Sequence, residues 1–395
     1  MAGPLNEISV LDLTSVVLGP LATQNLGDMG ADIIKVEAPA GDTTRYTGPK
    51  RSEDMSALYM GLNRNKRSIV LDLKINAAKE ALWKLIDRAD VFLHSIRPEA
   101  IERLGFGFEE VLARNERIVY AGVHGFGLDG PYSGRPAYDD VIQGLSGSAD
   151  LMARLVGEPR YMPTIIADKT CGLVTVNAIL AALFERERSG KGQFVEIPMF
   201  ETMVAFNMAD HIFGYNFEPP EGPMGYTRVL TPSRRPYKTL DGYICLLAYT
   251  DTQWAQFWLE VGKPELKDDP RFSTLSRRAD NIEEVYTLAS EFVSTRTTAE
   301  WLKTLPKLEI PCGEIVEIED IPDDPHLRAV DFFRSIEHPT EGRIKLVDFP
   351  IKFSRTPTKL ERLQPKLGQD SAEILRELGY KEAEVDELRL IGATN

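Results

Sequence analysis

The hydrophobic positions in the first half of the chain follow two alternating periodicities. Short apolar runs typical of buried strands occur at residues 8–13, 31–37, 68–73, 90–96, 117–126 and 194–199. Segments with apolar residues at helical spacing separate several of these runs, at residues 19–30, 76–89, 109–115 and 170–188. Strands that alternate with helices predict a doubly wound α/β fold with a mostly parallel, Rossmann-like sheet.

The pattern changes in the second half of the chain. Residues 211–240 are rich in Pro, Gly and Arg, which predicts a linker or an active-site loop. Residues 241–330 mix strand and helix patterns and predict a smaller α+β domain. Residues 331–395 are too few for a further domain, so we expect them to pack back on the large domain of residues 1–210.

Composition and charge narrow the classes of function. The chain has 395 residues, is 43% hydrophobic and carries a formal net charge of -14, without the basic face expected of a nucleic-acid-binding protein. Its three cysteines show no CxxC spacing and indicate neither a disulfide framework nor a zinc site, so we expect no metal. No secretory signal and no membrane-spanning run are evident. We therefore expect a cytoplasmic protein with no nucleic-acid or membrane partner.

One glycine motif requires a decision between two interpretations. The segment GFGLDG at residues 125–130 matches the dinucleotide-binding pattern GxGxxG and follows a predicted strand. However, Pro131, Gly134 and Pro136 stand where the phosphate-binding helix should begin. The sequence therefore favours a false match.

Asp168 lies between an apolar run and the predicted helix of residues 170–188. Aspartate is a preferred helix N-cap, so capping is one interpretation. A carboxylate flanked by apolar residues is also suited to act as a covalent nucleophile. The residues alone leave both roles open.

Basic side chains gather in two segments of this acidic chain, NRNKRSIVLDLK at residues 63–74 and RPEAIERLG at residues 97–105. Such clusters are either solvated loop charges or part of a pocket for a phosphorylated ligand.

Several ordered segments resemble those of family III CoA-transferases, the group that includes formyl-CoA transferase and the carnitine CoA-transferases. They include GPLATQNLGDMGADIIKVEAPAGDTTR, NRNKRSIVLDLK, ADVFLHSIRPEAIERLG, ILAALFERERSGKGQFVEI and LGQDSAEILRELGY. The resemblance runs nearly end to end. It implies an interlocked homodimer, with each active site between the large domain of one subunit and the small domain of the other.

The resemblance also implies a covalent mechanism on Asp168. Its carboxylate would attack the donor thioester to form a mixed anhydride, which CoA thiolate converts to an aspartyl-CoA thioester before the acceptor acid takes the CoA. Coenzyme A is then a substrate, and no tightly bound cofactor is implied. Water must be kept from the intermediates. The implied CoA contacts are Val16, Lys66, Arg67, Lys74, Ser95, Arg97, Arg103 and Tyr138.

Two features of the sequence concern the carboxylic acid substrate. Val17 stands where formyl-CoA transferase carries a glutamine, which argues against oxalate as the acceptor. Arg228, Arg234 and Arg235 offer guanidinium groups suited to the distal carboxylate of a dicarboxylic acid such as succinate. Solvated loop arginines explain these three residues equally well.

Two other classes of function are alternatives to a CoA-transferase. The α-methylacyl-CoA racemases of the same superfamily resemble the chain over the same region, but their acid/base histidine falls at Tyr138. A tyrosine with an ordinary pKa near 10 is a poor base at neutral pH, so the transferase is favoured. The third class is a CoA-binding or dinucleotide-binding module without covalent chemistry. Full activity of an Asp168→Ala protein would exclude the transferase mechanism.

Overall fold

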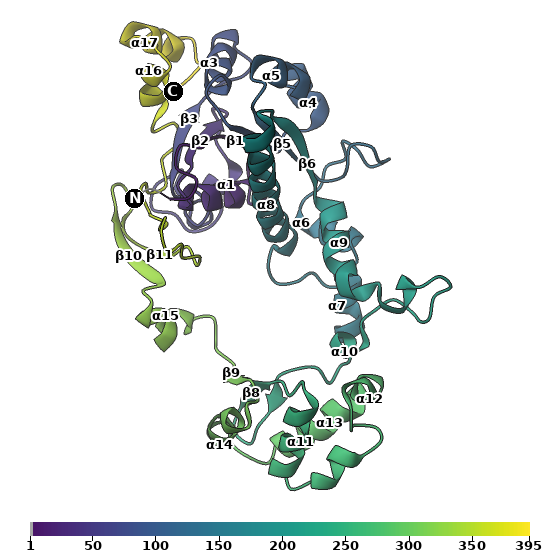
Figure 1. Ribbon diagram of the computed structural model, residues 1–395. Coiled ribbons are helices and arrows are strands. Elements are labelled where there is room, and N and C mark those ends of the chain that lie inside the picture. The colour runs from purple at the N-terminus through teal and green to yellow at the C-terminus, as the bar shows by residue number, and fades with distance from the viewer. Residues whose placement is uncertain (1–2) are drawn as a thin grey trace. The chain divides into compact units, whose positions relative to one another are not determined.

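The computed structural model describes residues 3–395 and contains a six-stranded parallel sheet in the order β3-β2-β1-β4-β5-β6 (Figure 1). Every neighbouring pair in this sheet is parallel. The strands are β1 (Ser9–Leu13), β2 (Asp32–Glu37), β3 (Lys66–Val70), β4 (Val91–His94), β5 (Val119–His124) and β6 (Gln193–Pro198). The predicted doubly wound α/β fold is thereby confirmed.

Helices cover both faces of this sheet because strand side chains alternate in direction. On β1, Val10 packs in the layer that contains α1 (Leu18–Asp28) and α8 (Ile166–Ser189), whereas Leu11 packs in the layer that contains α3 (Asn76–Ile86). The first layer contains α1 (Leu18–Asp28), α6 (Asp139–Leu145), α8 (Ile166–Ser189) and α9 (Met199–His211). The second contains α3 (Asn76–Ile86), α4 (Pro98–Leu104), α5 (Phe108–Arg114), α16 (Ser371–Glu377) and α17 (Glu382–Leu390).

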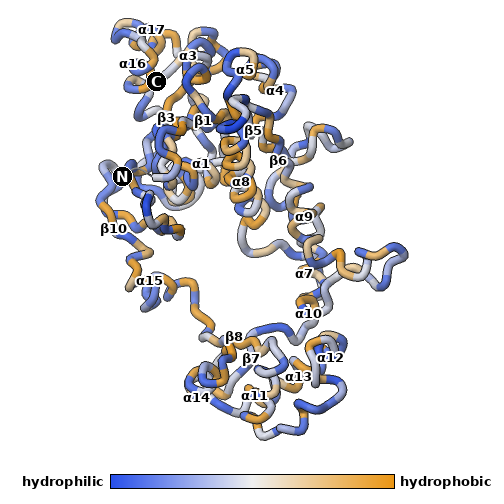
Figure 2. The backbone as a smooth tube through the Cα atoms, viewed as in Figure 1, coloured by the Kyte–Doolittle hydropathy of each residue, from blue (hydrophilic) through white to orange (hydrophobic). Residues whose placement is uncertain are grey.

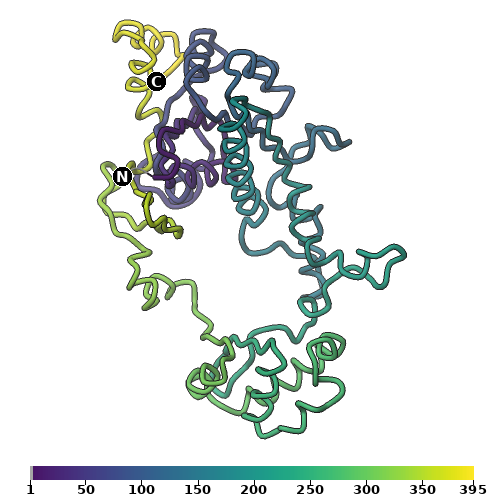
Figure 3. The backbone as a smooth tube through the Cα atoms, in the orientation of Figure 1, coloured from purple at the N-terminus to yellow at the C-terminus, as the bar shows by residue number. Residues whose placement is uncertain are grey.

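The outer edge of β3 is covered by the last part of the chain, drawn in yellow in Figure 3. The Ser68 amide donates to the Asp370 carboxylate at 2.8 Å, and the Val70 amide donates to the Ser371 hydroxyl at 3.1 Å. The Thr394 hydroxyl donates to the Val70 carbonyl at 2.7 Å. These contacts satisfy an edge that would otherwise be free to pair with another chain.

Contacts divide the described residues into two compact units. The first comprises residues up to 148, 161–206 and 326–395, and includes α2 (Ala57–Met60) and the hairpin of β10 (Phe333–His338) and β11 (Gly342–Val347). Helix α15 (Pro325–Ala329) directly precedes that hairpin in the chain. In Figure 2, hydrophobic colour marks parts of α8 and of the sheet.

The second unit comprises residues 149–160 and 207–325. Its core is rich in aromatic side chains, among them Trp254, Phe257, Trp258 and Trp301. They pack beside a three-stranded antiparallel sheet of β7 (Tyr237–Lys238), β8 (Tyr243–Leu246) and β9 (Cys312–Glu314). Its helices include most of α7 (Ser148–Val156), then α10 (Thr227–Leu230), α11 (Asp251–Glu260), α12 (Leu275–Asp280), α13 (Ile282–Val293) and α14 (Thr298–Thr304).

Within residues 3–395, α8 is the one helix with the length and apolar composition that a membrane span requires. Half of its most apolar window is buried inside the protein. The core helix of a globular unit meets the same criteria, so this is weak evidence for a span.

Candidate active site

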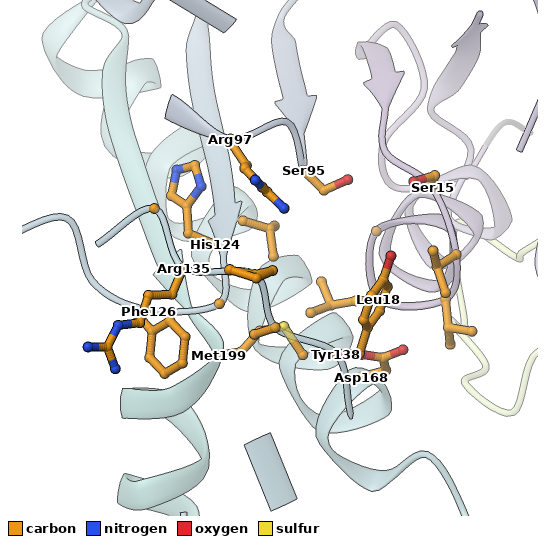
Figure 4. Close-up of a pocket in the computed structure, with 18 of the residues that line it drawn as sticks. Ser15, Leu18, Ser95, Arg97, His124, Phe126, Arg135, Tyr138, Asp168 and Met199 are labelled. Carbon is orange, nitrogen blue, oxygen red and sulfur yellow. The ribbon is translucent and has the colours of Figure 1, made fainter. Parts of the chain in front are cut away.

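A pocket of about 230 Å³ opens at the carboxyl edge of the parallel sheet (Figure 4). Its walls are formed after β1 by residues 15–19, after β4 by Ser95, Arg97 and Pro98, and by the end of β5 and the loop that follows it at residues 123–126, together with residues 134–138. Asp168 and Met199 complete the lining. The strand order reverses between β1 and β4, and open α/β sheets bind ligands at such a switch point.

Asp168 occupies the third position of α8, inside the helix rather than before it. The carboxylate of Asp139, at the start of α6, accepts hydrogen bonds from the amides of Ala167 at 2.8 Å and Asp168 at 3.1 Å. Asp139 therefore supplies the cap that the sequence offered as one role for Asp168. Among the described residues, none donates a hydrogen bond to the Asp168 carboxylate.

The surroundings of Asp168 disfavour its charge. Only 8% of the residue is exposed, and this burial raises the pKa of its carboxyl to about 7, with the nearby Asp139 carboxylate adding to the effect. Above that pH the group is an anion with little water and no hydrogen-bond donor to stabilise it. Such a carboxylate is well suited to nucleophilic attack.

Replacing Asp139 by asparagine should move the pH dependence of activity. If the Asp168 anion is the reactive form, kcat/KM rises with pH through about 7 in the wild-type enzyme. Removing the Asp139 charge lowers the pKa of Asp168, so the midpoint moves to lower pH by on the order of one unit. A pH profile of kcat/KM measures this.

The Asp139→Asn substitution keeps the helix cap, since an asparagine oxygen still accepts hydrogen bonds from the helix amides. The Asp139→Ala variant removes the cap as well and should lose about 1 to 2 kcal/mol of stability. An unchanged midpoint in the Asp139→Asn enzyme would show that the Asp139 charge does not act on the reactive group.

Four of the eight predicted CoA contacts line the pocket, namely Val16, Ser95, Arg97 and Tyr138, and so does Val17. Val16 has a φ of 71°, which is strained for a β-branched residue, and its amide donates to Asp42 at 3.1 Å. Figure 4 shows Tyr138 close to Asp168 in the view. Tyr138 as a whole is 69% exposed.

Lys66 and Arg67 do not line the pocket. The Lys66 ammonium is fully buried and donates to Asp12 at 3.1 Å, to the Pro20 carbonyl at 3.0 Å and to Asn63 at 2.8 Å. All three of its donors are therefore used. The Arg67 guanidinium pairs with Asp32 and Glu377.

The structure therefore differs from the prediction that Lys66 and Arg67 contact CoA, because both cations are engaged within the fold and lie outside the pocket lining. Their basic segment forms strand β3, which directs these two side chains to carboxylates of the fold rather than to a ligand. The other two predicted cations, Lys74 and Arg103, are exposed, lie outside the pocket lining and form no ion pair with a described residue.

The arginines predicted to bind the acid belong to the second unit. Arg228 donates to the Tyr286 hydroxyl at 3.1 Å, and its guanidinium lies 5.5 Å from the centre of the Tyr249 ring. Arg234 and Arg235 are exposed. All three remain predicted contacts of the acid substrate.

Three residues of the site escaped the sequence analysis. Asp139 caps a helix whose amides are 28 and 29 residues away in the chain, so no local pattern reveals it. Arg135 and His124 line the pocket from a loop and from the end of β5. His124 lies near the end of the strand predicted at residues 117–126, and this position could have identified it as a candidate site residue.

The GFGLDG segment does not present its amides to a phosphate. The Gly127 amide donates to Glu201 at 3.1 Å, and the Leu128 amide donates to Glu196 at 2.6 Å. Two carboxylates thus occupy the donors that a phosphate would need. The interpretation of this motif as a false match is supported.

Comparisons with known proteins place the chain in a family. The model of the family described as "CoA-transferase family III" matches residues 5–371. Human succinyl-CoA:glutarate CoA-transferase is 31% identical over 397 residues, covering 99% of this chain and 90% of the relative. Formyl-CoA:oxalate CoA-transferase of Streptomyces avermitilis is 33% identical over 416 residues, covering 99% and 98%.

Solved structures show the same relationship. A CaiB/BaiF family protein from Brucella suis superposes with a TM-score of 0.79 at 31% identity, covering 96% of this chain and 100% of that one. A Mycobacterium tuberculosis protein in an orthorhombic crystal form gives 0.82 at 29% identity, covering 94% and 99%. Matched over nearly its whole length, this chain belongs to CoA-transferase family III.

Proposed function

We propose that the enzyme transfers CoA between an acyl-CoA thioester and a carboxylic acid, with Asp168 as the covalent nucleophile. The Asp168 carboxylate attacks the thioester carbonyl, and the carbon–sulfur bond breaks to give a mixed anhydride and CoA thiolate. The thiolate attacks the aspartyl carbonyl and releases the donor acid, leaving an aspartyl-CoA thioester. The acceptor carboxylate attacks the aspartyl carbonyl and displaces CoA thiolate, which gives a second mixed anhydride. The thiolate then attacks the acceptor's carbonyl carbon, so that the new thioester leaves and the Asp168 carboxylate is restored.

The observation that carries this proposal is the buried Asp168 carboxylate in the pocket, free of hydrogen bonds from the described residues. Its neighbours in the lining include the apolar side chains of Val17, Leu18 and Met199. An anhydride survives only where water is scarce, and an apolar lining supports that condition.

Mass spectrometry of the intact protein tests the mechanism. The protein is incubated with a panel of acyl-CoA thioesters, the adduct is trapped with hydroxylamine, and the modified peptide is mapped. A hydroxamate on Asp168 is the expected result, and the thioester that produces it identifies the donor acid. No adduct from any thioester, together with hydrogen exchange at an α-carbon, would favour racemase chemistry instead.

We further propose a small dicarboxylic acid, such as succinate, as donor or acceptor. The human relative is named for succinyl-CoA and glutarate, both derived from dicarboxylic acids. Arg234 and Arg235 are exposed cations suited to a second carboxylate, as is the partly exposed Arg228. In the thioester panel, succinyl-CoA and glutaryl-CoA should therefore modify Asp168 more than acetyl-CoA or butyryl-CoA.

We also propose that the enzyme is an interlocked homodimer. On α8, the residues Leu173 and Phe184 are 55% and 64% exposed, which leaves apolar surface for a second copy to cover. We expect a particle of twice the 44.2 kDa chain mass.

Linked chains cannot exchange without unfolding. When tagged and untagged dimers are mixed under native conditions, affinity capture should recover no hybrid after a day. The same mixture, unfolded in urea and refolded, should yield hybrids. Hybrids that form without unfolding would contradict interlocking, and a particle of single-chain mass would contradict the dimer.

A further inference from the structure

Two histidines end neighbouring strands at the pocket. His94 is the last residue of β4 and His124 is the last residue of β5. Their ring centroids are 5.7 Å apart in an edge-to-face contact. His94 is 1% exposed and packs against the rings of Phe92 and Tyr120, so it lies behind His124 as part of the core.

A glycine makes room for the outer imidazole. Gly122 lies on β5 two residues before His124, on the same face of the strand, and pairs with His94 on β4. A Cβ atom at Gly122 would lie only 2.7 Å from Nε2 of His124. The His124 ring therefore lies back over Gly122, confined between the strand and His94.

His124 is buried but open to the pocket. It is 9% exposed and belongs to the pocket lining (Figure 4). No described residue forms a hydrogen bond with its ring nitrogens. A polar side chain held this firmly, without a protein partner, is placed to bind a ligand.

The surroundings favour an uncharged ring. Burial lowers the pKa of His124 to about 4. Burial and the neighbouring His124 imidazole lower the pKa of His94 to about 3, while the Ile96 backbone opposes this shift. At neutral pH His124 thus offers one N–H donor and one nitrogen acceptor, without a charge. These groups suit an uncharged polar partner better than a carboxylate or phosphate.

We propose that His124 is a substrate-contacting residue that donates a hydrogen bond to a carbonyl oxygen of the acyl-CoA. The inference rests on the proposed function, because it takes this pocket as the acyl-CoA site. The oxygen belongs either to an amide of the pantetheine arm or to the thioester. Both are uncharged carbonyl groups, and free CoA carries only the amides.

Binding measurements in the Asp168→Asn enzyme, which cannot form an adduct, distinguish these two sources. Affinities of CoA and acetyl-CoA are measured by calorimetry with His124 intact and with His124→Phe, which keeps the ring but removes its nitrogens. For an amide contact, both ligands should bind about tenfold more weakly to the His124→Phe protein. For a thioester contact, only acetyl-CoA should lose affinity.

Two further variants separate this contact from a structural role. His124→Gln retains a side-chain donor and should recover part of the affinity that His124→Phe loses. His94→Phe alters the same aromatic cluster behind the pocket and should leave both affinities within about twofold. A purely structural role would instead make the two phenylalanine variants equally weak.

The proposal is overturned if His124→Phe binds both ligands as well as the parent, or if His94→Phe weakens them equally. If His124→Phe does not fold, ¹⁵N NMR of the histidine rings in the Asp168→Asn protein replaces it. The His124 nitrogens should then shift when CoA or acetyl-CoA is added, and no shift with either ligand overturns the proposal. Failure of the parent to bind CoA would instead reject the proposed function of the pocket.

Discussion

The Asp168→Asn enzyme is expected to lose CoA transfer by at least about 10⁴-fold, because an amide cannot form the anhydride or the thioester intermediate. The initial rate of acyl exchange measures the loss. Asp140→Asn is the matched control, since it makes the same chemical change at an exposed residue of α6 outside the pocket lining. It should retain activity. Transfer at more than a hundredth of the wild-type rate by the Asp168→Asn enzyme would contradict the covalent role.

The same substitution should also change how stability depends on pH. The folded-state pKa of Asp168 is raised from 3.8 to about 7, so the folded protein holds this proton over a range where the unfolded chain has released it. Stability is therefore lost as pH rises from about 4 to 7, by up to about 4 kcal/mol for a three-unit shift. Asparagine cannot ionise and avoids this loss.

Thermal unfolding at two pH values measures the effect. The Asp168→Asn protein should have a higher Tm than the wild type at pH 8, and the difference should shrink towards pH 4. A difference that is the same at both pH values would mean that ionisation of Asp168 does not cause it. An equal Tm difference would not affect the predicted loss of CoA transfer in the Asp168→Asn enzyme, which the activity assay tests separately.

Replacing Lys66 by alanine should destabilise the fold by about 3 to 5 kcal/mol. Burial raises the pKa of Asp12, but Lys66 and Lys35 outweigh this and hold it well below its ordinary value. Without Lys66, one of the two ammonium groups that stabilise the buried Asp12 anion is lost. Burial lowers the pKa of Lys66 itself to about 8, so the folded protein releases this proton at a lower pH than the unfolded chain does, and the titration of Lys66 adds stability as pH rises above about 8.

Urea unfolding measures this destabilisation. The matched control is Lys74→Ala, which removes an exposed cation and should change stability by less than about 0.5 kcal/mol. A Lys66→Ala protein with wild-type stability but weak CoA binding would restore the direct contact that the sequence suggested.

The centre of the sheet was predictable because its strands β4 and β5 are buried on both faces. Val91 and Val119 belong to short apolar runs that are buried throughout, which is the pattern that parallel strands between two helical layers require. Each run is recognisable without its neighbours. The central strands of the parallel sheet can therefore be predicted from the residues of each segment alone.

The site was less predictable because its partners are distant in the chain. Nothing near Asp168 indicates that Asp139 will cap its helix and so allow α8 to begin at Ile166, before the predicted start. Lys66 lies in a basic segment of the kind that binds phosphate, and only its buried ion pair with Asp12 shows that it belongs to the core. A charge pattern identifies candidate cations but does not reveal where they point.

The cover on β3 has a consequence for synthesis of the protein. A ribosome releases the strand long before it releases Asp370, Ser371 and Thr394, whose side chains bind it. The nascent sheet therefore emerges with an open edge while about three hundred further residues are translated. During that interval the edge is a site for mispairing or for a chaperone, and the first unit to be made is the last to be completed.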